Sequence, residues 1–443
     1  MKNIKSILFI PLLIFCSCTQ LDDINPINSI AANGAVNNLG SAQAAVNGIY
    51  DALQNGTLVY DGFLVLAQIY TDEAIFTGTF PTRFEFFSLN VQTSNGTNNA
   101  VFSSFYDVIN LANNVLDLLP AVEDPTLTTE QLNSFLGEAR FIRGLAYFYL
   151  VNYYGEIPLV TQPTRDVGDI LNVPKSSVEA VYEQIIADLQ FAESNLLPNG
   201  SGRVNATVAT GFLARVYLYL GQWQNALDHA TATLGADFDL TTIPYLQDEL
   251  FYLSFTPSDG NVLNFWYGPA EFGGRNDAQP SPFLLTAYED GDLRRAVTID
   301  DSFQAASVPF VTKYDDFAAG ISGSGTDPIY FMRYAEQLLI AAEAAAELGD
   351  FNQAATYYNQ VRVRAGLAPN NLTADNFEAL LLQERLVEFA FEGPHRLFDL
   401  RRRGQIFDIL GPRGYQSCHD VWPLPQSEID RNPNLEQNGC CNC

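Results

Sequence analysis

The feature that most constrains the fold of this chain is a seven-residue pattern that occurs twice. Residues 220–226 read LGQWQNA and residues 348–354 read LGDFNQA, so both copies follow Leu-Gly-x-aromatic-x-x-Ala. Each copy lies between two stretches with the apolar spacing of an amphipathic helix. The glycine permits a tight turn, and the aromatic ring and the alanine join the two flanking helices. The sequence therefore predicts helical hairpins of one repeated design.

These hairpins resemble tetratricopeptide repeats, which stack into an α-solenoid. The expected fold class is mostly α: a tetratricopeptide-like helical-repeat solenoid with irregular loops and a few short β-hairpins. Residues 55–100 are expected to be rich in loops, with an aromatic stretch at 76–87. Apolar periodicity, capping residues and prolines predict the helices. They comprise residues 41–54, 102–119, 129–154, 178–195, 205–219, 222–234, 330–347 and 351–364.

A segment between the two repeat turns, residues 236–328, has a different character. Residues 251–255 and 262–267 are rich in aromatic and β-branched side chains and are predicted to be strands. Turn residues at 258–260 are expected to join them into a hairpin. A loop rich in Gly, Pro and Asn follows at 268–282. Because irregular loops on a rigid scaffold often carry binding residues, this insert is a candidate region for function.

The amino-terminal residues predict export and a lipid anchor. Two lysines precede an apolar run at 7–15 that is too short to span a bilayer, which is typical of a cleaved secretory signal. The end of this run resembles a bacterial lipobox, in which Cys18 is acylated. We therefore expect a signal peptide at 1–17, a lipidated cysteine with a flexible tether at 18–40, and a single domain at 41–443.

The chain is strongly acidic, with 51 Asp and Glu against 23 Lys and Arg and a formal charge of −28 at pH 7. A negative field of this size repels phosphate backbones, so we expect no nucleic-acid partner. It also repels polyanionic ligands, which makes a neutral ligand the better expectation.

The cysteines outside the signal region gather near the carboxyl end. In an exported protein such a cluster is more often disulfide-bonded than metal-binding. Three pairings are possible, and the sequence does not choose between them. His419 beside the first cysteine leaves a zinc site as an alternative to the expectation of no metal. The disulfide candidates are Cys418, Cys440, Cys441 and Cys443.

The sequence offers no catalytic motif. Its three histidines are not spaced for nucleophilic or metal chemistry, and no nucleophile elbow, phosphate loop or zinc-protease motif occurs. Paired acids at Asp72–Glu73 and at Asp290 with Asp292 have the residue types of a glycosidase. Asp292 followed by Arg294 is more simply a capped helix start with its own ion pair. We therefore expect no enzyme activity and no cofactor.

Acidic and basic residues alternate near the carboxyl end at helical spacing, which allows ion pairs along and between helices. We interpret this run as a packing and salt-bridge network. Its members are Glu384, Arg385, Glu388, Glu392, Arg396, Arg401 and Arg402.

Several segments, in order along nearly the whole chain, resemble the SusD/RagB family of the starch-utilisation system. The strongest is EARFIRGLAYF at 138–148, which continues to YGEIPLV at 154–160. Others are FYDVINLAN, RYAEQ, NQVRVRAGL, FEGPHRLFDLR and PLPQSEID. They begin at residues 105, 333, 359, 391 and 423.

This resemblance implies a cell-surface lipoprotein of the outer membrane that binds an oligosaccharide or polysaccharide. The partner it implies is a SusC-like TonB-dependent transporter, which the binding protein covers like a hinged lid and supplies with glycan. Two alternatives remain: a RagB-like peptide-binding lipoprotein, and a helical-repeat scaffold of the transporter complex without a glycan ligand.

In the family that the chain resembles, ligand residues come from the loops after the first helices and from the insert. Sugar binding requires flat aromatic faces and polar groups for the hydroxyls. The stacking candidates are Phe80, Phe84, Trp266, Tyr267 and Phe272. The hydrogen-bonding candidates are Arg83, Asn99, Arg275, Asn276 and Asp277.

Overall fold

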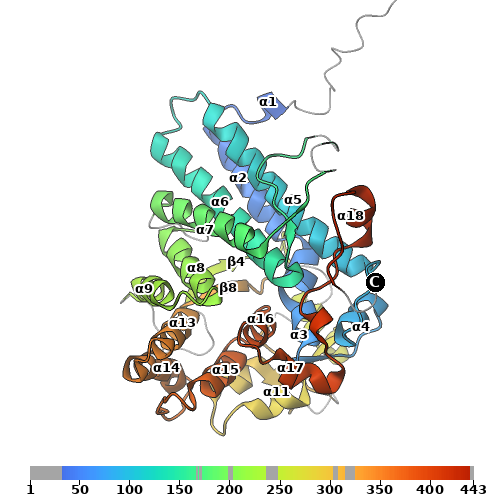
Figure 1. The fold of residues 1–443 in the computed structure, drawn as a ribbon, viewed down its shortest axis with the longest axis vertical. Helices are drawn as coiled ribbons and strands as arrows, with labels where there is room; N and C mark the ends of the chain where they lie inside the picture. The colour runs from blue at the N-terminus through green and yellow to red at the C-terminus, as the bar shows by residue number, and fades with distance from the viewer. Residues whose placement is uncertain are drawn as a thin grey trace, which may run out of the picture.

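The computed structural model describes residues 32–165, 168, 172–197, 203–235, 248–302, 308–314 and 325–439 (Figure 1). The predicted signal peptide, Cys18 and the cysteines at 440, 441 and 443 lie outside the described residues. Of the predicted tether, residues 32–40 are described, and they contain the short helix α1 (Ala32–Ala35).

Paired antiparallel helices form the bulk of the molecule and confirm the predicted helical-repeat class. Successive helices pack on one another from α5 to α9, and α13 then packs on α9 and α14. Figure 1 shows the later pairs, α8 with α9 and α13 with α14, along one flank. The helices are α2 (Leu39–Leu53), α5 (Gly96–Leu118), α6 (Thr129–Tyr154), α7 (Val178–Asn195), α8 (Ala206–Tyr219), α9 (Trp223–Thr233), α13 (Tyr334–Glu347) and α14 (Phe351–Arg364).

The two repeat turns adopt the backbone that their glycines were predicted to supply. Gly221 has φ of 66° and Gly349 has φ of 86°, both in the left-handed region. Side chains with a Cβ rarely occupy this region, so glycine allows each hairpin to reverse within a few residues. Helix α13, which precedes the second turn, is buried from Tyr334 to Ala346 because α8, α9, α14 and α15 (Phe377–Glu388) all pack against it.

Local caps explain why several helices begin where the sequence predicted. Thr128 accepts a hydrogen bond from the amide of Gln131, whose side chain returns the contact, and this capping box starts α6. Ser177 caps α7 in the same way through the amide of Ala180. Because each cap satisfies amides that have no partner within the helix, the boundaries of α6 and α7 match the predicted ones.

The region 55–100 is more ordered than its glycines and asparagines suggested, and the expectation of loops is wrong for much of it. A π-helix, η1 (Thr57–Val65), leads directly into α3 (Leu66–Tyr70), and almost all of their residues are buried. The short strand β1 (Ala74–Phe76) and the helix α4 (Pro81–Phe87) follow. A run that is apolar on all sides has no helical periodicity to detect, because every face is buried.

The predicted hairpin between 251–255 and 262–267 is also wrong. Strand β4 (Glu249–Leu253) pairs with the distant strand β8 (Ile329–Arg333), and residues 263–267 form a short helix, α10. The other short elements of the insert are η4 (Ala270–Phe272), β5 (Ala278–Pro280), α11 (Pro282–Ala287), α12 (Leu293–Thr298), β6 (Ile299–Asp300) and β7 (Phe310–Val311).

The carboxyl-terminal segment returns across the amino-terminal half. Trp422 is fully buried and stacks on Tyr153 of α6, with ring centroids 4.1 Å apart. The amide of Gln426 then donates to the carbonyl of Thr93. Remaining elements are η2 (Leu119–Ala121), β2 (Ile157–Pro158), β3 (Lys175–Ser176), α15 (Phe377–Glu388), α16 (His395–Arg402), α17 (Ile406–Leu410), η6 (Gly411–Arg413), η7 (Ser417–His419) and α18 (Gln426–Arg431).

The predicted salt-bridge network near the carboxyl end is present and buried, but its acids pair with basic residues distant in sequence and not at the helical spacing within the run. Arg294 donates to Glu384 at 2.6 Å and to Glu388 at 3.0 Å, and it also pairs with Asp292 at 2.7 Å. Arg333, at the end of β8, pairs with Glu388 at 2.9 Å. The network therefore ties the insert to α15. Asp292 caps α12 through the amide of Arg294, so it has a structural role.

Candidate functional site

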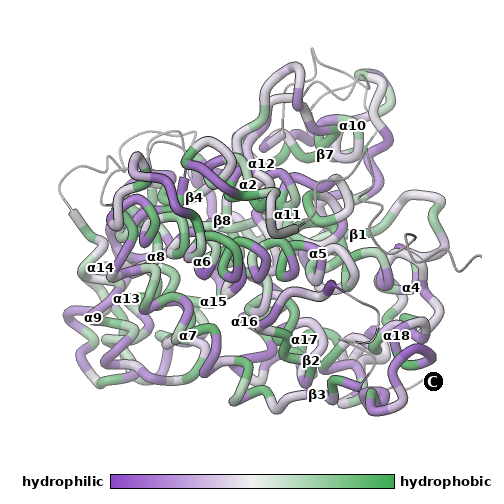
Figure 2. Tube along the Cα trace, turned by 90° about the horizontal axis from the view of Figure 1, so that it is seen from above, coloured by the Kyte–Doolittle hydropathy of each residue, from purple (hydrophilic) through white to green (hydrophobic). Residues whose placement is uncertain are grey.

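The two candidate regions, 76–87 and 264–288, lie together because β1 and β5 pair as antiparallel strands. Phe76 is opposite Ala278 in this ladder, and the amide of Thr77 donates to the carbonyl of Asp277 at 2.9 Å. A Cβ on Gly78 would lie 2.6 Å from the Asp277 carboxyl carbon, so glycine allows this close approach. Figure 2 shows α10 and β7 at the end of the molecule opposite α9 and α14.

Trp266, at the end of α10, is the centre of what we call the aromatic cluster: Tyr60, Phe80, Arg83, Trp266 and Arg275. Tyr60 stacks on Trp266 with centroids 5.0 Å apart, and Phe80 meets it edge to face at 5.9 Å. The guanidinium carbon of Arg83 lies 4.7 Å from the Trp266 ring centre, and that of Arg275 lies 5.6 Å away. The indole is therefore half-buried among other rings and cations.

Each arginine of the aromatic cluster is matched by a carboxylate. Arg83 pairs with Asp61 of η1 at 2.8 Å, and Arg275 pairs with Asp277 at 3.2 Å. Burial alone would lower the pKa of Arg83, but the hydrogen bonds and charge of Asp61 raise it above its usual value. Burial raises the pKa of Asp277 despite its contact with Arg275. Two cations and two acids leave this part of the surface close to neutral.

Three phenylalanines of the two candidate regions are exposed, and one of them, Phe80, belongs to the aromatic cluster. The exposed fraction is 39 % for Phe80 and 53 % for Phe84, which lies one helical turn further along α4. Phe272, also 39 % exposed, belongs to the same loop as Arg275. These three rings and Arg275 are the exposed members of the predicted set, whereas Trp266 and Asn99 are half-buried.

Four other members of the predicted set are buried and offer a ligand no direct contact: Tyr267, Arg83, Asn276 and Asp277. Tyr267 is fully buried and donates to Gln68 at 2.7 Å, so it is a core residue. Arg83, Asn276 and Asp277 are also buried and support the exposed residues from beneath. Asn99 lies on α5, where its side chain accepts from Ser427 in the carboxyl-terminal segment.

Sequence reasoning missed Tyr60 and Asp61, which reach the aromatic cluster from the π-helix. A π-helix inside a helical run is rare and often marks a functional site. The available signal was an aspartate, Asp61, within the apolar run LVYDGFLVLAQIY at 58–70. A charge there requires a buried partner, which is Arg83.

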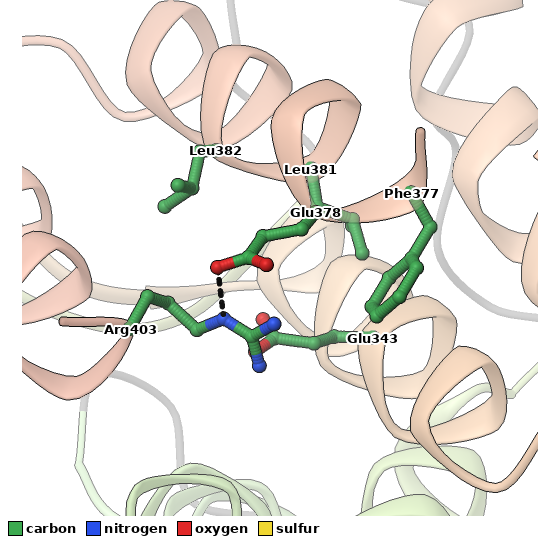
Figure 3. Close-up of a pocket in the computed structure, with 6 residues that line it drawn as sticks. All are labelled: Glu343, Phe377, Glu378, Leu381, Leu382 and Arg403. Atoms are coloured by element: carbon green, nitrogen blue, oxygen red, sulfur yellow. Dashed lines mark hydrogen bonds and ion pairs between the residues drawn. The ribbon is translucent and has the colours of Figure 1, made fainter. Parts of the chain in front are cut away.

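Two hollows elsewhere in the molecule lack the features of a sugar-binding site. One of about 390 Å³ lies between α2, α5 and the turn at Asp259. Its lining includes Asp51, Gln54 and Asp107 but no aromatic ring, so it has no stacking surface. A second, beside α15, leaves no room for water, because Arg403 extends between Glu343 and Glu378 (Figure 3).

Within the described part of the chain, no group of three or more His, Cys, Asp or Glu side chains is placed to hold a metal ion. Cys418 is disulfide-bonded. None of the described helices is both long and apolar enough to cross a membrane.

Comparison with known proteins identifies the family. Residues 49–218 match a family model described as "Starch-binding associating with outer membrane", and residues 303–417 match one described as "SusD family". The SusD-like protein P2 of Formosa agariphila is 28 % identical, with 99 % of both chains covered. SusD-like protein P38 of the same organism is 25 % identical, again with 99 % of both chains covered. This chain belongs to the SusD/RagB family.

Solved SusD structures have the same fold. A SusD superfamily protein from Bacteroides vulgatus gives a TM-score of 0.81 at 21 % identity, covering 90 % of this chain and 98 % of that one. A laminarin binding SusD-like protein gives 0.79 at 22 %, covering 91 % and 99 %. Surface glycan-binding protein A from Bacteroides fluxus gives 0.76 at 20 %, covering 90 % and 99 %. SusD proteins are non-catalytic binding proteins.

Proposed function

We propose that this SusD protein binds a neutral oligosaccharide at the aromatic cluster, on the outer surface of the outer membrane. The observation that carries the proposal is the position of exposed Phe80 beside Arg275, which is itself paired with Asp277. Aromatic rings cover the apolar C–H face of a sugar, and the guanidinium of Arg275 hydrogen-bonds its hydroxyls. The laminarin-binding relative, whose name records a glucan ligand, supports the same ligand class.

The charge balance of the aromatic cluster supports a neutral ligand over an anionic one. Arg83 and Arg275 are both paired with acids, so neither offers an unmatched positive charge to a uronate or a sulfate. The formal charge of the whole chain, −28, repels polyanions as well. A neutral glycan adds no charge of its own to these two balanced pairs.

The rest of the proposal concerns delivery. Acylation at Cys18 would hold the protein at the membrane, and a SusC-like TonB-dependent transporter would receive the glycan. Full-length similarity to SusD-like proteins and the match to a family described as associating with the outer membrane support this setting. A peptide ligand, or a scaffold role without a ligand, would leave the exposed rings of α4 without a purpose.

Isothermal titration with matched oligosaccharides tests the proposed function. The mature chain is titrated with neutral gluco-oligosaccharides and with uronate oligosaccharides of the same length. We expect heat of binding from a neutral series and none from the uronates at physiological ionic strength. Failure of a broad neutral panel to bind would overturn the glycan assignment, and stronger binding of the uronates would overturn the neutral ligand class.

A further inference from the structure

The guanidinium of Arg275 occupies the space over the two rings that a sugar would need. Its central carbon lies 5.0 Å from the ring centre of Phe80 and 5.6 Å from that of Trp266. The exposed fraction of the Arg275 side chain is 32 %, so it covers these rings from the solvent side. A sugar that stacks on either ring must bring its C–H face within van der Waals distance of that ring. The guanidinium of Arg275 occupies this position.

The backbone of Arg275 is fixed, whereas its side chain is held by a few contacts at the surface. Its amide donates to the carbonyl of Phe265 at 2.7 Å, which fixes the base of the loop. The side chain donates to Thr79 at 3.0 Å and to Asp277 at 3.2 Å. The Asp277 carboxylate is buried, but it also lies 3.6 Å from Arg83, so its charge stays paired when the Arg275 guanidinium leaves the rings.

We infer that Arg275 is a specificity-determining residue of the glycan site: a cap on Trp266 and Phe80 that only a polyhydroxylated ring displaces. A displaced guanidinium needs hydrogen-bond acceptors and loses its contact with the rings. A sugar provides both a C–H face for the rings and a rim of hydroxyl acceptors for Arg275. A purely apolar ring provides a C–H face but no hydroxyl acceptors for Arg275, so the cap excludes such a ring.

The ligand preference rests on the proposed function, whereas the cap itself can be tested without a ligand. In the ligand-free protein, Arg275→Ala should expose Trp266 to the neutral quencher acrylamide. Trp266→Phe in both backgrounds separates this signal from those of Trp223 and Trp422. The matched control is Arg295→Ala, which removes an arginine of similar side-chain exposure, 34 %, that pairs with Asp301.

We expect the Trp266 quenching constant to rise at least about twofold in Arg275→Ala and to stay unchanged in Arg295→Ala. An unchanged quenching constant in Arg275→Ala, in a variant that retains its thermal unfolding midpoint, would overturn the cap. This result does not depend on whether the protein binds any glycan.

A second measurement tests selectivity. The affinity for a neutral oligosaccharide that binds the wild type is compared with the affinity for phenol, an apolar ring with a single hydroxyl. We expect the ratio of the two affinities to fall about tenfold in Arg275→Ala, because phenol gains access and the sugar loses acceptor contacts. An unchanged ratio would overturn the specificity role. If the wild type binds no neutral oligosaccharide, the proposed function fails, while the quenching result still decides the cap.

Discussion

Both oxygens of the Asp61 carboxylate accept hydrogen bonds from Arg83, at 2.8 Å from Nε and 3.2 Å from Nη2. Asp61 belongs to the π-helix η1, whereas Arg83 belongs to α4, so the pair joins two elements that border the aromatic cluster. Arg83 in turn lies against the rings of Tyr60 and Phe80. The ion pair therefore fixes the position of the rings on which ligand contact depends.

Removal of one partner of this pair is expected to destabilise the fold. Asp61→Ala leaves Arg83 buried without its carboxylate and should lower the free energy of unfolding by about 3 kcal/mol. Urea denaturation followed by circular dichroism measures the change. The double variant Asp61→Ala with Arg83→Met removes both charges and should be more stable than Asp61→Ala alone. A double variant that is no better would contradict the role of the unpaired charge.

Glu73 gives a prediction about pH. It is 2 % exposed, accepts from the amide of Phe391 at 2.7 Å, and burial raises its pKa from 4.5 to about 8. The folded chain therefore keeps a proton that the unfolded chain releases near pH 4.5. The contribution of Glu73 to stability is full below pH 4.5, falls as the pH rises, and levels off above about pH 8.

Glu73→Gln keeps the acceptor for Phe391 and removes this titration. At pH 7 the variant should be more stable than the wild type by about 3 kcal/mol, and at pH 4 the difference should vanish. Denaturation curves across this pH range measure it, with the exposed Glu123→Gln as control. A constant difference between variant and wild type at every pH would show that Glu73 is ionised in the folded state.

Gly349 in the second repeat turn allows the cost of backbone strain to be measured without a change in side-chain packing. A Cβ there meets nothing within 4 Å, but φ is 86°. Gly349→Ala should therefore cost about 1–2 kcal/mol through backbone strain alone. Gly48 inside α2 has equally open space and no positive φ, so Gly48→Ala should stabilise the protein by about 0.5–1 kcal/mol. Equal effects of the two substitutions on the thermal midpoint would refute this explanation.

The proposed glycan contacts predict a difference between two exposed phenylalanines. Phe84→Ala should weaken binding of a neutral oligosaccharide about 3- to 10-fold, because a stacking ring is lost. Phe407 on α17 is exposed to a similar degree, 61 %, and Phe407→Ala should leave the affinity unchanged. Calorimetric titration of both variants measures this contrast, and a loss caused by Phe407→Ala instead would move the site elsewhere.

The proposed anchor predicts a change in cell fractionation. Cys18→Ala removes the acylated sulfur, so the protein should leave the membrane fraction, since anchoring of this kind depends on buried acyl chains. Cys16→Ala is the matched control and should retain the wild-type distribution. Immunoblots of the membrane and soluble fractions measure the distribution of each variant. Retention of Cys18→Ala in the membrane fraction would reject the anchor.

The sequence predicted the helices with strong local signals and missed those without them. The capping box at Thr128 and the glycine after Tyr154 delimit α6, so its bounds were predicted correctly. Residues 57–70 carry no such alternation, because both faces of η1 and α3 are buried. Residues 263–267 read equally well as strand or helix, and the distant partner strand β8 decided the pairing of β4.

For the candidate site, the sequence identified residue types but could not determine their exposure. It placed Phe80, Trp266 and Arg275 in the two regions that the β1–β5 ladder brings together. It could not distinguish the buried Tyr267 from the half-buried Trp266 beside it, because adjacent aromatics on a short helix point in different directions. Tyr60 and Asp61 reached the cluster through a backbone geometry that composition does not reveal.

The β1–β5 ladder has a consequence for how such chains vary. The contact between Thr77 and Asn276 beside this ladder joins residues 199 positions apart, and helices α5 to α9 lie between them. The entropy of closing a loop grows only with the logarithm of its length, so doubling the intervening chain adds about 0.6 kcal/mol. Residues added to the loops between these helices would therefore add little to the entropic cost of closing the ladder, so the two strands can stay paired when those loops lengthen.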